Sequence, residues 1–186
     1  MGMSFNMYLC DEKSFEEIKG KILNKTEINL DEYSIKSYYL DKIFNGLEFI
    51  LKKIVPNDIV KIIFYSSDII SSFDMKSDQY KNLSNEEVLL LKINTPEVSY
   101  ISHEYISEIY KHFINENGDS IFFGFDETEL NKNKVYGNWE KTYLEIDGKE
   151  RKECLFAECF KNEYLKIKEF YKEAIDNKYI IFVEVK

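Results

Sequence analysis

The stretch from Tyr39 to Ile54 limits the possible folds of this chain more than any other part of the sequence. Its apolar residues recur at steps of three and four, the spacing of one face of an α-helix. Asp41 in the first turn and Lys52 in the last complement the helix dipole, and Pro56 prevents the helix from continuing. Such a face cannot remain in water, so other elements must pack against it. Its members are Leu40, Ile43, Phe44, Leu47, Ile50, Leu51 and Ile54.

Other helices are predicted from capping residues and from periodicity. Ser14 with Glu17 forms a capping-box pattern, and Ser102 is a typical N-cap residue, so a helix is expected after each. Apolar residues on one stripe predict a long helix from Glu153 to Asp176. The apolar run from Asp58 to Tyr65 fits either a strand or a helix, and we favour a helix.

Strands are predicted at both ends of the chain and in its middle. We expect residues 24–37 to form a loop and residues 66–86 to be the most mobile segment. Helices between strands indicate an α+β fold, with one small sheet covered by several helices in a single domain over residues 1–186. The apolar runs of strand length are Phe5–Leu9, Val88–Ile93, Val98–Ile101 and Tyr179–Val185.

The charge balance of the chain disfavours two classes of partner. The formal net charge is −9, and Arg151 is the only arginine. Bidentate contacts to phosphate and guanine depend mainly on arginine, so we expect no nucleic-acid partner. Anionic membrane surfaces repel an acidic protein, and no apolar run approaches the length of a membrane span. We therefore expect a soluble cytoplasmic protein.

The residue types that carry most enzyme chemistry are sparse or badly spaced. His103 and His112 are nine apart, which puts them on roughly opposite faces of one helix and argues against a shared metal. Cys10, Cys154 and Cys159 form no Cys-x-x-Cys unit and are expected to be reduced thiols. Nucleotide-binding glycine loops, nucleophile elbows and zinc-protease motifs are absent from the sequence. We expect no metal and no cofactor.

Five residues form the candidate binding site. Asp41, Asn45 and Glu48 share a face of the helix over residues 39–54, either as its solvated side or as the polar lining of a groove. Tyr136 and Trp139 lie in a polar neighbourhood, where they either anchor their loop on the core or present a binding surface. No catalytic residue is assigned.

Several of these segments resemble the YfbM-like family of bacterial proteins, which is also known as domain of unknown function 1877. The opening Met1-Gly2-Met3 and the helix Asp41–Leu51 are similar to those of the family. Tyr100–Ile106, the loop Val135–Trp139 and the C-terminal helix and strand also resemble it. Phe44, Asn45, Glu48 and Gly137 stand where the family often has Trp, His, His and Pro. The resemblance implies a compact α+β domain without an assigned biochemical function.

Two functional hypotheses follow from the sequence. The first is a non-enzymatic binding protein with a protein partner, for example an immunity-like protein that neutralises a basic toxin enzyme, because opposite charge steers association. The second is a small hydrolase or transferase that uses carboxylates in a cleft.

The charge argument makes a direct prediction for nucleic acids. We expect no appreciable binding to duplex DNA or RNA at about 0.15 M salt, because the chain is acidic and has a single arginine. A gel-shift titration tests this, and submicromolar, salt-sensitive binding would contradict it.

Overall fold

A five-stranded antiparallel sheet forms the centre of the molecule. The computed structural model describes residues 4–40, 43–74, 83–115, 128–135, 144–146, 149–151 and 155–185. The strand order is β2-β1-β7-β4-β3, and each neighbouring pair is antiparallel. A separate hairpin pairs β5 (Leu144–Ile146) with β6 (Lys149–Arg151). The sheet strands are β1 (Phe5–Cys10), β2 (Lys36–Leu40), β3 (Asp68–Ser71), β4 (Glu97–Ile101) and β7 (Ile180–Val185).

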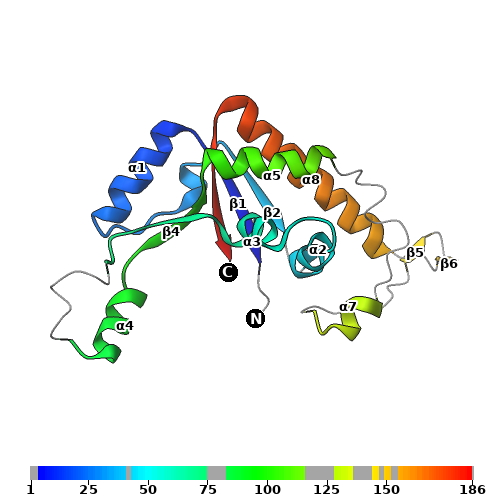
Figure 1. The fold of residues 1–186 in the computed structure, drawn as a ribbon, viewed down its shortest axis with the longest axis horizontal. Coiled ribbons are helices and arrows are strands. Elements are labelled where there is room, and N and C mark those ends of the chain that lie inside the picture. Colours follow the sequence, from blue (N-terminus) through cyan, green and yellow to red (C-terminus); the bar gives the residue numbers. More distant parts are fainter. Residues whose placement is uncertain are drawn as a thin grey trace.

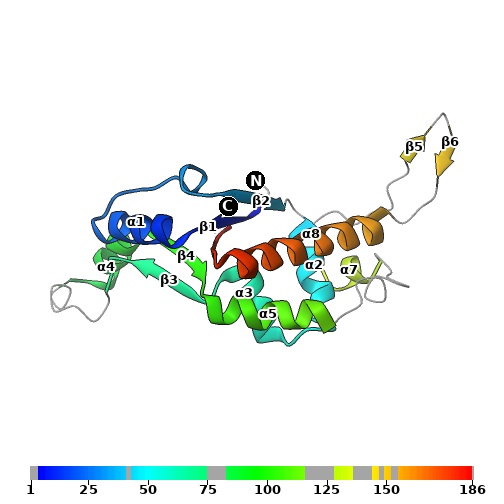
Figure 2. The ribbon, with the colours of Figure 1, turned by 90° about the horizontal axis from the view of Figure 1, so that it is seen from above.

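Helices cover both faces of this sheet, which confirms the predicted α+β class. Figure 1 shows α1 on one side of the strands, and α2, α3, α5 and α8 on the other. Figure 2 shows α5 and α8 running side by side, with β5 and β6 beyond the start of α8. The helices are α1 (Glu12–Leu23), the 3-10 turn η1 (Leu30–Glu32), α2 (Ile43–Leu51), α3 (Asn57–Tyr65), α4 (Asn85–Ile93), α5 (His103–Asn115), α7 (Thr128–Lys132) and α8 (Leu155–Asn177).

The strand β1 supplies side chains to two separate cores. All six of its residues are buried, because the side chains of a strand alternate between the two covered faces of the sheet. Met7 belongs to the core beneath α2, α3, α5 and α8, whereas Tyr8 belongs to the core beneath α1 and η1. The neighbouring strand β7 does the same with Val183 and Phe182.

Aromatic rings fill the larger core. The ring of Phe5 on β1 stacks on Phe44 of α2 at 5.9 Å and tilts against Phe64 of α3 at 5.2 Å. On the far side, Phe113 of α5 makes edge contacts of 5.4 Å with both Tyr164 and Tyr171 of α8. Such aromatic pairs add to the stabilisation from burial, and here they join helices to strands and to one another.

Most of the long periodic segments have the predicted structure. The helix favoured over residues 58–65 is α3, and the long helix predicted near residues 153–176 is α8. The expected extended piece at residues 98–101 is β4, and the strand predicted at residues 179–185 is β7. These segments were identified because each buries a continuous stripe or run of apolar side chains.

The predicted start of the helix at Tyr39 is wrong. Tyr39 and Leu40 belong to β2, where Leu40 pairs with Phe5 and Tyr39 with Asn6, and the described helix begins at Ile43. Strand pairing with β1 outweighs the helical spacing of these two residues. The residues 24–37 are consequently not all loop, since they contain η1 and the first part of β2.

Two further predictions, one of a helix cap and one of a strand, are wrong. The N-cap of α1 is Asp11, whose side chain accepts a hydrogen bond of 2.7 Å from the backbone N–H of Ser14, so Ser14 lies inside the helix. The aliphatic run Val88–Ile93, predicted as a strand, is most of helix α4. A complete capping box between Ser84 and Glu87 starts that helix and outweighs the strand-like composition.

Leu47 lies at the centre of the larger core, so its truncation should be severely destabilising. The residue is completely buried on α2, and Leu47→Ala should lower the free energy of unfolding by about 2–5 kcal/mol. Leu165→Ala on α8 is the matched control, because that leucine is 39% exposed. Chemical denaturation measures both changes. Equal midpoints for the parent and Leu47→Ala would show that this face of α2 is not core.

Candidate functional site

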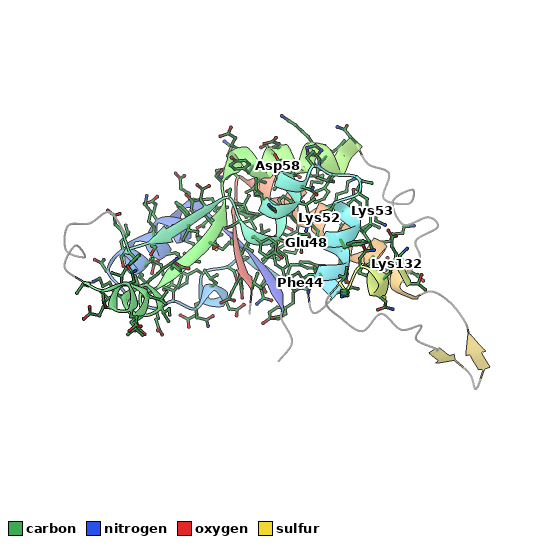
Figure 3. The ribbon with its side chains drawn as sticks, turned by 60° about the horizontal axis from the view of Figure 1, so that its bottom comes forward. Phe44, Glu48, Lys52, Lys53, Asp58 and Lys132 are labelled. Carbon is green, nitrogen blue, oxygen red and sulfur yellow. The ribbon has the colours of Figure 1, made fainter. Side chains whose placement is uncertain are left out.

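The structure places two of the five predicted site residues on α2. Asn45 and Glu48 lie one helical turn apart, and Figure 3 shows Glu48 between Phe44 and Lys52 along this helix. Asp41, Tyr136 and Trp139 lie outside the described residues. The predicted grouping of all five therefore stays a prediction.

The carboxylate of Glu48 is buried and held at both oxygens. Glu48 is only 8% exposed, so its interpretation as part of a solvated helix side is wrong. Lys52 places its Nζ 2.6 Å from Oε1, and the Tyr65 hydroxyl donates to Oε2 at 3.0 Å. A buried carboxylate needs such partners to offset the loss of water. The arrangement joins the end of α2 to the end of α3.

Asn45 is partly buried, and one of its polar atoms is not satisfied. Its Nδ2 atom is inaccessible to solvent and has no hydrogen-bond partner among the described residues.

Lys53, just past the end of α2, makes an ion pair with Glu129 of α7 and lies 5.0 Å from the Phe49 ring centre. These contacts hold α7 against α2 and, like those of Glu48, are structural.

The described histidines and cysteines form no metal centre. His103 and His112 lie at opposite ends of α5, and no group of three or more metal-ligating side chains occurs in the described part of the chain. Cys10 is buried and free, and burial followed by the nearby Asp11 raises the pKa of its thiol to about 12. Cys159 is free and exposed, and Cys154 lies outside the described residues.

Sequence reasoning missed a polar cluster on the face of the sheet beneath η1. Asn6 of β1 pairs in register with Glu184 of β7, and both point to the same face as Tyr8. The Tyr8 hydroxyl donates to Glu184 Oε2 at 3.0 Å, and Asn6 Nδ2 donates to the same oxygen at 3.4 Å. Burial, followed by this carboxylate, raises the pKa of the Tyr8 phenol well above its ordinary value.

Asn6 is a polar residue in an almost wholly apolar strand. It is completely buried, and its Oδ1 has no hydrogen-bond partner among the described residues. An unsatisfied buried acceptor costs free energy, so a residue of this kind is unusual in a strand that serves packing alone. Asn6 on β1 and Glu48 on α2 therefore mark two places where a polar side chain is buried next to the hydrophobic cores.

Glu184 also forms part of an open hollow, which we call the acidic groove. The hollow has a volume of about 210 Å³ and lies where the end of β7 runs beside the start of β4. Two carboxylates and one hydroxyl line it, from Glu97, Glu184 and Ser99. The rest of its lining is aliphatic and comes from β4, β7 and the segment around η1, namely Ile28, Leu30, Val98, Val183 and Val185.

A second hollow lies between α5 and the end of α8. Its volume is about 290 Å³, and its lining includes His103, Ser107 and Lys178 but no carboxylate. It therefore lacks the paired acids that a hydrolase of the expected kind would need, and the acidic groove is the better candidate site.

One sequence signal could have pointed to the acidic groove. Glu184 interrupts the most apolar strand of the chain, and Asn6 interrupts the first one. The two positions become neighbours only through the register of β1 with β7, which the sequence alone does not reveal.

The sheet and its two unequal helical layers define an α+β protein of the kind represented by YfbM. The solved structure of YfbM from Escherichia coli, a protein of unknown function, covers 100% of both chains at a TM-score of 0.58 and 11% sequence identity. The family model for the domain of unknown function DUF1877 matches residues 1–183, and the chain belongs to that family. No curated protein matches the chain. At this identity the structural likeness concerns the fold alone.

The contact between Tyr65 and Glu48 should make the free energy of unfolding depend on pH in the alkaline range. Burial and the Glu48 carboxylate raise the pKa of the Tyr65 phenol to about 12, against about 10 in an unfolded chain. Its contribution is present in full below about pH 10 and is lost as the pH rises toward 12, because the unfolded state then binds fewer protons.

The variant Tyr65→Phe isolates this contribution. Because Tyr65 is 48% exposed, the loss of its hydrogen bond to Glu48 should lower the free energy of unfolding at neutral pH by only about 0.5–1.5 kcal/mol. The difference between parent and variant should shrink from about pH 10 to about pH 12 in denaturant titrations. A difference that stays constant over this range would contradict the assigned contact.

Proposed function

We propose that this protein is a non-enzymatic binding protein whose partner is a cationic protein. An immunity-like protein that neutralises a basic toxin enzyme is one concrete form of this function. The observation that carries the proposal is the acidic groove, an open hollow with two carboxylates and an aliphatic lining. The net charge of −9 would steer a cationic surface toward it.

The lining of the acidic groove suits a lysine or arginine side chain of the partner. Such side chains bury an aliphatic stem while they keep a charged end at a polar edge. Ile28, Leu30 and Val98 would contact the stem, and Glu97 and Glu184 would receive the charged end. Arginine would gain most, because its guanidinium can bind a carboxylate with two parallel hydrogen bonds.

The contacts of Glu48 and Glu184 also support binding over catalysis. A general acid or base must exchange a proton with its substrate, within hydrogen-bond reach. Glu48 is held by Lys52 and Tyr65, and Glu184 receives hydrogen bonds from Tyr8 and Asn6. The open shape of the acidic groove matches a docking surface better than it matches a water-excluding cleft.

Affinity capture tests the proposal. The immobilised protein is incubated with a lysate of its source organism, and captured proteins are identified by mass spectrometry. The retained partner is then purified and titrated by calorimetry. We expect a basic partner whose affinity falls as the salt concentration rises from about 0.05 M to about 0.5 M.

Two double variants locate the binding surface. Glu97→Gln with Glu184→Gln should weaken binding about tenfold or more, because it removes both carboxylates of the acidic groove. Glu104→Gln with Glu108→Gln removes the same charge from two exposed positions of α5, outside the acidic groove, and should bind almost like the parent. Equal affinity in both double variants, or an acidic partner, would contradict the proposal.

A further inference from the structure

Helix α4 exposes its aliphatic side chains to an unusual degree. Its nine residues are Asn85–Ile93, and none of them is buried. Leu89, Leu90, Leu91 and Ile93 are 57%, 59%, 42% and 70% exposed. Contiguous exposed aliphatic surface on a water-soluble protein typically marks an interaction site.

Both ends of α4 are capped by side-chain hydrogen bonds, although none of its side chains is buried. The capping box of Ser84 and Glu87 closes the N-terminus, with Ser84 N donating to Glu87 Oε2 at 2.8 Å. At the other end, Asn94 Nδ2 donates to Leu90 O at 2.8 Å, and Thr95 Oγ1 donates to Leu91 O at 2.7 Å. Caps alone seldom keep so short a helix formed in water, since most helical stability in proteins comes from packing.

The three most exposed aliphatic side chains of α4 lie on one stripe. Leu89, Leu90 and Ile93 follow Glu86 at steps of three, four and seven residues, so the four share a helical face. Two such stripes can pack against each other, as in helical bundles. Figure 1 shows α4 beyond the start of β4, at the opposite end of the molecule from β5 and β6, where a second molecule can approach it.

The charges of α4 complement those of a second α4 that runs the other way. Glu86 and Glu87 lie in the first turn and Lys92 lies in the last. In an antiparallel pair related by a two-fold axis at Leu89, Glu86 of each copy lies at the same level as Lys92 of the other, whose long side chain flanks the stripe. The two helix dipoles are then also opposed, which is favourable.

We propose that α4 is the contact surface of a symmetric homodimer, with two α4 helices packed antiparallel along Glu86, Leu89, Leu90 and Ile93. This inference is independent of the proposed function, because the dimer uses α4 and the cationic partner uses the acidic groove. One short helix covers less than the roughly 800 Å² per partner of a standard interface, so the dimer is a weak one. Its dissociation constant should lie in the micromolar range.

Salt should strengthen the dimer. Each copy carries a net charge of −9, and added ions screen the repulsion between two like-charged molecules. Sedimentation velocity over a wide range of protein concentration, at about 0.05 M and about 0.5 M salt, measures both the mass and the affinity. A monomer under all these conditions would overturn the proposal.

Substitution in the stripe tests its location. Leu90→Glu should weaken dimerisation about tenfold or more, because it places a charge at the centre of the contact. Leu165→Glu changes the charge equally on α8, at a leucine that is 39% exposed, and should dimerise like the parent. Equal dimerisation of both variants would refute the assigned surface.

A charge exchange tests the antiparallel arrangement, even if Leu90→Glu disturbs the helix. Glu86→Lys and Lys92→Glu should each weaken the dimer, and the double variant should recover most of the affinity. The two positions are six residues apart, so they are not neighbours on one helix and recovery must come from the second copy. Additive losses without recovery would contradict the antiparallel pairing. Circular dichroism confirms the helix content of every variant.

Discussion

Burial of β1 and β7 on both faces is the constraint on which the rest of the structure depends. Adjacent residues such as Met7 and Tyr8 belong to different cores, so the chain must supply cover on each side of the sheet. Helices α2, α3, α5 and α8 supply one layer, and α1 with the segment around η1 supplies the other. Asn6 on β1 is fully buried and is therefore shut off from bulk water, and its amide instead donates to Glu184, which also accepts from Tyr8.

Two carboxylates in this protein resolve the cost of partial burial in different ways. Glu48 pairs with the cation of Lys52, so its charge is balanced within the helix layer. Glu184 accepts hydrogen bonds from the Tyr8 hydroxyl and the Asn6 amide, and it also lines the open acidic groove. The first arrangement joins two helices, whereas the second places a carboxylate at the edge of an open hollow.

Segments with long, regular apolar patterns were predictable, whereas those decided by pairing or capping were not. α3, α8 and β7 bury continuous stripes or runs, and the sequence identified them. Leu40 lies in a strand because Phe5 lies opposite it, a contact that no local pattern contains. For α4 the signal was present in Ser84 and Glu87, but five aliphatic residues between 88 and 93 resembled a strand. The acidic groove depends on the register of β1, β7 and β4, which is a tertiary property.

The position of β7 also has a consequence for synthesis on the ribosome. β7 lies between β1 and β4 in the sheet, yet it follows every other described element in the chain. Until β7 emerges, the edges of β1 and β4 that pair with it have no partner strand. Both hydrophobic cores also lack the side chains that β7 contributes, such as Val183 and Phe182. The nascent chain must therefore wait with unpaired strand edges, a state that favours aggregation and chaperone binding. Such non-local pairing also slows folding, because distant segments must meet before the sheet gains stability.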